Sequence, residues 1–182
     1  IIESYSQFDF YDGGGIDVSF LGLGQADKNG DVNVSKFNGK AMGVGGFMNV
    51  TTGSKKVVFC GTFTAGGLEV KEEDGKLIIT KEGKNKKFFN RVEQISFSGK
   101  YSQVNKQSVL YVTERAVFTL EEDQMTLIEI APGIDLEKEI LALMDFKPRI
   151  SPKLKMMPKE IFQPKFGILK NHIKSKCKVD QI

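Results

Sequence analysis

The stretch that decides the fold of this chain reads GVGGFMNV, residues 43–50. Residues 32–37 precede it with strand character, and the apolar run of residues 56–60 follows it as a second strand. Its three glycines let the backbone approach a neighbouring group that side chains would keep away. If residues 47–52 form a short helix, the free amides of its first turn would face an oxygen-bearing ligand. A tight packing turn explains the same glycines, so the pattern alone leaves both interpretations open.

The bulk composition is typical of a globular domain. Of the 182 residues, 40% are hydrophobic and 27% are charged, and no apolar run approaches the roughly 20 residues that a membrane helix needs. We therefore expect one domain with a sizeable core, or most of a larger domain, and no membrane contact. Two cysteines far apart in the sequence favour a reducing, cytoplasmic location. The chain has no initiator methionine, and we expect it to be a piece of a longer protein.

Lysines crowd the last segment. We therefore expect a main domain at residues 1–147 and a basic tail at residues 148–182, which several prolines interrupt. A solvated tail explains this charge, and a site for anionic ligands is the alternative. Nucleic acid is not expected as a partner, because the net charge is only +3 and the tail lacks interleaved aromatic side chains.

Apolar and alternating runs predict several further strands, at residues 16–23, 57–63, 108–113, 116–120 and 125–130. Asp74-Gly75 joins two charged alternating runs and predicts a surface hairpin inserted between core elements. Asp135 is expected to cap a helix, because Glu137 and Glu139 follow in its first turn and apolar residues recur at helical spacing.

Several kinds of chemistry are not expected. The single histidine, His172, lies in the lysine-rich tail, which argues against Ser–His and Cys–His nucleophile pairs and most transition-metal sites. The acidic turn at residues 27–31 has the opening spacing of a calcium loop, but Val32 and Asn38 stand where Gly and Glu are required. No P-loop motif is present. We therefore expect no metal site.

Glu114 is the most notable carboxylate, because it lies at a break between two apolar strands and its charge needs a partner there. A structural ion pair with Arg115 or a lysine is the simpler interpretation, and a functional carboxylate is the alternative.

Several motifs occur in the same order in family I coenzyme A (CoA) transferases. They are FDFYDGGG at residues 8–15, GVGG at 43–46, TERAVF at 113–118, IAPGID at 130–135 and SPK at 151–153. The chain therefore resembles the C-terminal part of this family, with the closest match to its acetate/propionate CoA-transferase type. The resemblance implies an α/β fold, with an open mixed sheet and flanking helices of the isomerase/CoA-transferase type, present here as a partial domain.

The resemblance also implies an activity. CoA would move between an acyl-CoA and a short-chain carboxylic acid through a glutamyl-CoA thioester, with CoA and acyl-CoA as substrates and no permanently bound cofactor. In such enzymes the nucleophilic glutamate lies in a Glu-x-Gly motif ahead of residues 8–12. Glu3 does not fit, because Tyr5 stands where Gly is needed. The chain is therefore expected to be inactive alone, to need an N-terminal CoA-transferase portion as its partner, and to form homo-oligomers.

The same resemblance assigns roles within the glycine stretch. The backbone N–H of Gly46 would stabilise the oxyanion of the tetrahedral intermediate, and Gly43, Gly45, Gly46 and Phe47 would bind CoA. A main-chain donor at a loop-to-helix junction is fixed before the reaction and needs no reorganisation. The alternative is a non-catalytic module that holds CoA or another anionic ligand with this loop and the tail lysines.

Overall fold

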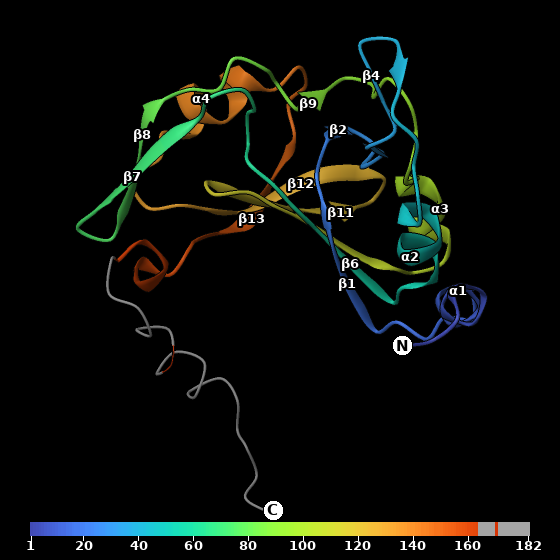
Figure 1. The fold of residues 1–182 in the computed structure, drawn as a ribbon. Helices are drawn as coiled ribbons and strands as arrows, with labels where there is room; N and C mark the ends of the chain where they lie inside the picture. The colour runs from blue at the N-terminus through green and yellow to red at the C-terminus, as the bar shows by residue number, and fades with distance from the viewer. Residues whose placement is uncertain (164–169, 171–182) are drawn as a thin grey trace, which may run out of the picture.

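Six strands form the central sheet in the computed structural model, which describes residues 1–163 and residue 170 (Figure 1). In spatial order they are β1 (Val18–Gly22), β6 (Lys56–Cys60), β10 (Ser108–Val112), β11 (Ala116–Glu121), β12 (Gln124–Ile130) and β13 (Arg149–Met156). Strands β1, β6 and β10 are parallel, β11 is antiparallel to both of its neighbours, and β13 is parallel to β12. This open mixed sheet confirms the predicted α/β class.

Helices and small sheets surround the central sheet. Figure 1 shows α1, α2 and α3 gathered at one end of the molecule and the β7–β8 hairpin at the other. The helical segments are α1 (Ser4–Asp12), α2 (Phe47–Gly53), α3 (Gly99–Val104), α4 (Leu136–Glu139) and the 3-10 turns η1 (Leu141–Leu143) and η2 (Lys159–Phe162). The short strands are β2 (Gln25–Asp27), β3 (Val32–Asn33), β4 (Lys36–Phe37), β5 (Lys40–Ala41) and β9 (Phe88–Phe89). No helix in the described part of the chain is long and apolar enough to cross a membrane.

The main core lies on one face of the sheet and is rich in aromatic side chains. Phe59 of β6 is fully buried and contacts Phe47 of α2 at 5.9 Å and Tyr111 of β10 at 5.5 Å between ring centroids. Rings at these separations add stabilisation beyond the area that they bury. Phe47 thereby fixes the start of α2 over the end of β6.

Residues 27–31 form a turn, as the sequence predicts, and the Asp27 carboxylate holds it together. The buried carboxylate of Asp27 accepts hydrogen bonds from the backbone amides of Asn29, Asp31 and Val92. These amides satisfy a charge that would otherwise be costly to bury.

The predicted hairpin is present as β7 (Glu69–Glu73) and β8 (Lys76–Lys81). Its two turn residues, Asp74 and Gly75, have φ values of 51° and 72°, as a type I′ turn requires. Most of the hairpin is exposed, but Leu77 is buried and packs with Val117 of β11. The hairpin therefore covers part of the second face of the sheet.

At the β1 edge of that second face, one large apolar side chain of the described residues is exposed. Side chains alternate along a strand, so Phe20 of β1 and its neighbour Val58 of β6 lie on the face opposite Phe59. Phe20 is 72% exposed, although it lies in the middle of its strand. Parallel strands are usually covered on both faces, so this exposed area marks a surface that another segment is suited to cover.

Strand β13 lies in the segment that the sequence assigns to the basic tail. Its pairing with β12 shifts register between Leu127 and Glu129, and Pro152 falls in the resulting irregular stretch. Proline is tolerated there because β13 is an edge strand. The boundary at residue 147 stays a prediction, and most of the basic tail, including His172, lies outside the described residues.

Candidate functional site

The glycine stretch forms a loop that leads directly into α2. The helix begins at Phe47, so the first of the two interpretations left open by the sequence has its helix, and Gly46 precedes it as the N-cap with φ −82° and ψ 6°. Gly43 and Gly45 have φ values of 83° and 54°, in the left-handed region that side chains make unfavourable. The loop conformation therefore requires glycine at these two positions.

The backbone amides of this loop are free. In the described part of the chain, the N–H groups of residues 43–46 donate no hydrogen bond, whereas the Phe47 N–H donates to the Val44 carbonyl at 3.2 Å. A Cβ added at Gly43 or Gly45 would meet nothing within 4 Å. At Gly46 it would lie 3.2 Å from the ring of Phe8 in α1. Consecutive donors are thus left unused beside open space, and Gly46 is half-covered by one aromatic ring.

The loop lies toward the carboxyl ends of the parallel strands. α2 immediately precedes β6, and its first residue, Phe47, stacks on Phe59, the penultimate residue of that strand. In open α/β sheets, ligands bind in the crevice outside the carboxyl ends of the strands. The structure therefore brings Gly43, Gly45 and Gly46 to the edge where a substrate is expected. The ring of Phe47 packs against the sheet, and its role in CoA binding stays a prediction.

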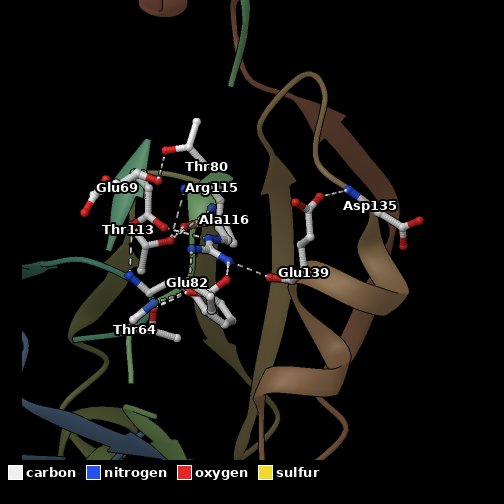
Figure 2. Close-up of polar contacts among 12 residues, drawn as sticks. Thr64, Glu69, Thr80, Glu82, Thr113, Arg115, Ala116, Asp135 and Glu139 are labelled. Carbon is white, nitrogen blue, oxygen red and sulfur yellow. Dashed lines mark hydrogen bonds and ion pairs between the residues drawn. The ribbon is translucent and has the colours of Figure 1, made fainter. Parts of the chain in front are cut away.

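A buried charge network lies beyond the ends of β6 and β10 (Figure 2). Arg115 is fully buried, and its Nε donates to Glu114 Oε1 at 2.6 Å. Its Nη1 donates to Glu82 Oε2 at 2.7 Å and to the Glu139 carbonyl at 3.0 Å. The guanidinium carbon also lies 5.0 Å from the centroid of the Phe63 ring. This geometry confirms the structural ion pair expected for Glu114.

The network fixes three loops around one guanidinium. Glu114 Oε2 accepts a hydrogen bond from the Phe63 amide at 2.8 Å, which holds the segment after β6. Glu82 follows β8, and Glu139 ends α4, whose N-cap Asp135 accepts hydrogen bonds from two amides of the first turn as predicted. Arg115 therefore sets the positions of the segments that follow several strands.

Charge pairing favours the ionised forms of Glu82 and Arg115. Burial alone would raise the pKa of Glu82, but hydrogen bonds from Arg115 and Thr64 outweigh it and hold that pKa below its usual value. Burial likewise acts to lower the pKa of Arg115, and its bonds to Glu82 and Glu114 raise it instead. Sequence analysis missed Glu82, because it lies 33 residues from Arg115 in a turn with no distinctive motif.

The described residues contain no cluster of three or more Cys, His, Asp or Glu side chains arranged to hold a metal ion. The groups that the site presents are therefore backbone amides and charged side chains.

Free backbone amides at the carboxyl edge of an open mixed sheet are suited to an anionic or acyl substrate. The fold occurs in a CoA-transferase and in a decarboxylase. The glutaconate CoA-transferase of Acidaminococcus fermentans superposes with a TM-score of 0.60 at 15% identity, over 94% of this chain and 62% of that chain. The decarboxylase AibA/AibB superposes with a TM-score of 0.63 at 16% identity, over 86% of this chain and 57% of that chain. At such low identity these two structures show the fold alone.

Two curated relatives are far more similar. The chain is 54% identical over 162 residues to the acetate CoA-transferase YdiF of Escherichia coli K12, which covers 89% of this chain and 30% of the relative. It is 55% identical over 170 residues to the caffeate CoA-transferase of Acetobacterium woodii, over 91% of this chain and 32% of that protein. The YdiF apoenzyme from E. coli O157:H7 superposes with a TM-score of 0.88 at 53% identity, over 91% of this chain and 32% of that chain.

These comparisons confirm the resemblance to CoA-transferases that the motifs indicate. The chain spans 30 to 32% of the length of the curated relatives that it matches. No family model matches the chain.

Proposed function

We propose that this chain is the C-terminal portion of a CoA-transferase that moves CoA between an acyl-CoA and a short-chain carboxylic acid through a glutamyl-CoA thioester. Its part in this reaction is to supply the glycine loop that binds the oxyanion and CoA. The observation that carries the proposal is the run of unbonded amides at residues 43–46, beside the carboxyl ends of the parallel strands. Identity of 54% to an acetate CoA-transferase over most of the chain supports the same activity.

In this mechanism the Gly46 N–H donates a hydrogen bond to the negative oxygen that forms when an acyl group changes hands. The N–H is held by the loop before α2, so it needs no reorganisation as charge develops. Removal of one such donor typically lowers kcat by about 10²–10³-fold. Gly43 and Gly45 leave the neighbouring backbone open, so that the thioester of CoA can approach it.

The nucleophilic glutamate is proposed to come from polypeptide outside these 182 residues. The chain spans only 30% of the YdiF sequence, and the exposed Phe20 on the edge strand β1 offers an apolar contact for that polypeptide. We propose that the N-terminal CoA-transferase portion is the partner, and that the assembled enzyme is a cytoplasmic homo-oligomer.

Mass spectrometry tests whether the nucleophilic glutamate lies outside this chain. The 182-residue chain incubated with acetyl-CoA is expected to gain no covalent mass, whereas the complete enzyme is expected to gain a CoA adduct under the same conditions. A stable adduct on the isolated chain would contradict the proposal. CoA binding by the complete protein without adduct or turnover would instead favour a non-catalytic CoA-binding module.

A further inference from the structure

Lys87 lies at the carboxyl ends of two parallel strands, although it is far from them in the sequence. Lys87 directly precedes β9 in the sequence, and the residue is only 8% exposed. A Cβ added at Gly61, the residue after β6, would lie 2.9 Å from Lys87 Nζ and 3.1 Å from the Cβ of Leu23, the residue after β1. The ammonium therefore lies against the ends of β1 and β6, at the edge toward which the glycine loop is also directed.

The ammonium has no partner that explains its burial. In the part of the chain that the structure describes, Lys87 Nζ makes no hydrogen bond and no ion pair within 4.0 Å. Glu114 is the nearby opposite charge, but its two oxygens already bind Arg115 Nε and the Phe63 amide. A lysine ammonium has three donors. Among the described residues, the fully buried polar side-chain atoms without a partner are Ser19 Oγ and Gln107 Oε1, so Lys87 Nζ keeps some contact with solvent and its donors can be reached by an anion.

Its electrostatics agree with this geometry. Burial lowers the pKa of the Lys87 ammonium, and the charge of Glu114 offsets only part of that effect. An anionic oxygen bound at Nζ would favour the charged form and supply the missing hydrogen bond.

We infer that Lys87 binds an anionic oxygen of a substrate at the carboxyl edge of β1 and β6. The inference rests on the proposed function, which supplies two such oxygens: the carboxylate of the acid and the phosphates of CoA. Lys87 is then a substrate-binding residue at the carboxyl ends of β1 and β6, and a Cβ at Gly61 would crowd both its ammonium and Leu23.

Steady-state kinetics of the complete enzyme tests this role, with acetate and acetyl-CoA as the probes. Lys87→Met is expected to raise KM for one of them by about 10- to 100-fold, which corresponds to the free energy of one hydrogen bond to a charged group. Lys87→Arg is expected to bring KM part of the way back to that of the unchanged enzyme. The substrate whose KM rises identifies the source of the oxygen, because acetate reports a carboxylate and acetyl-CoA reports a phosphate. Lys86→Met is the matched control, since Lys86 makes an exposed pair with Asp145 at 2.8 Å, and it is expected to change neither KM.

A second measurement separates a binding role from a structural one. Lys87→Met is expected to raise this KM while its far-UV circular dichroism and melting temperature stay close to those of the unchanged protein, because in the described residues Lys87 Nζ makes no hydrogen bond or ion pair that the change would remove. Unchanged KM values for both substrates in Lys87→Met would overturn the inference.

Calorimetry distinguishes failure of the Lys87 inference from failure of the proposed transferase function. If the complete protein binds CoA or acetate without turnover, and Lys87→Met abolishes that binding, the inference stands and the transferase assignment fails. Equal binding of both ligands by Lys87→Met and the unchanged protein, or no binding by either, overturns the inference.

Discussion

Replacing Arg115 with methionine removes the cation from the buried charge network while keeping an unbranched stem that can stay buried. Arg115 is fully buried, and the change leaves Glu82 and Glu114 near each other without their shared partner. It also removes the donor to the Glu139 carbonyl and the contact with the Phe63 ring. The variant is therefore expected to be strongly destabilised.

The magnitude follows from how exposed the two orphaned carboxylates are. Removing one member of a buried ion pair typically costs about 3–5 kcal/mol. Glu82 and Glu114 keep side-chain exposures of 31% and 18%, so water partly replaces the guanidinium. We expect a loss near the lower end of that range, about 3 kcal/mol.

Urea unfolding followed by circular dichroism measures this loss, and Arg149→Met is the matched control. Arg149 pairs with Glu122 at 2.7 Å, but their side chains are 41% and 76% exposed. An exposed pair of this kind contributes about 0–1 kcal/mol. Adding Glu82→Gln and Glu114→Gln to Arg115→Met is expected to recover part of the stability, because no unpaired charge remains. Equal losses for Arg115→Met and Arg149→Met would refute the reasoning.

Three other predictions concern the pH response, the hairpin and the exposed Phe20 on β1. The pKa of Glu82 is lowered in the folded protein, so its carboxylate adds stability that is present above the usual pKa of 4.5 and is lost as the pH falls through the lower folded-state pKa. The free energy of unfolding in urea should therefore change less with pH in this acidic range for Glu82→Gln than for the unchanged protein. An equal change with pH in both proteins would contradict this. Gly75→Ala places a side chain at φ 72° and should cost about 1–2 kcal/mol, seen as faster hydrogen exchange confined to β7 and β8; unchanged exchange would argue against the turn. Phe20→Asp replaces a side chain that is 72% exposed, so it should leave the melting temperature of the isolated chain unchanged but weaken its association with the N-terminal portion, measured by co-purification; undiminished association would exclude this face as the contact.

Features fixed by neighbouring residues could be predicted from the sequence. The Asp74-Gly75 hairpin and the Asp135 cap depend on turn and capping chemistry within a few residues, and both are present. The helix at Phe47 is present, but the sequence offers it only as one of two open interpretations of the glycine stretch. The Glu114–Arg115 pair joins adjacent residues and could likewise be predicted from the sequence.

Features that depend on contacts between distant segments were not predictable. Strand β13 contains Pro152 and looks like part of a broken tail until its edge position beside β12 is known. Glu82 has no motif of its own and acquires its role only from Arg115. Lys87 is one of several lysines in a basic turn, and only the fold places its ammonium against Gly61.

The Gly46 amide is the centre of the proposed mechanism, and a comparison of two variants of the complete enzyme tests it most directly. Gly46→Ala keeps the N–H and adds a Cβ 3.2 Å from the Phe8 ring, whereas Gly46→Pro removes the N–H and also adds carbon. The difference between the variants therefore reports the loss of the donor, together with the restriction that the proline ring places on Gly45. The proposed mechanism predicts that kcat of Gly46→Pro falls about 10²–10³-fold below that of Gly46→Ala. Equal kcat values for the two variants would contradict it.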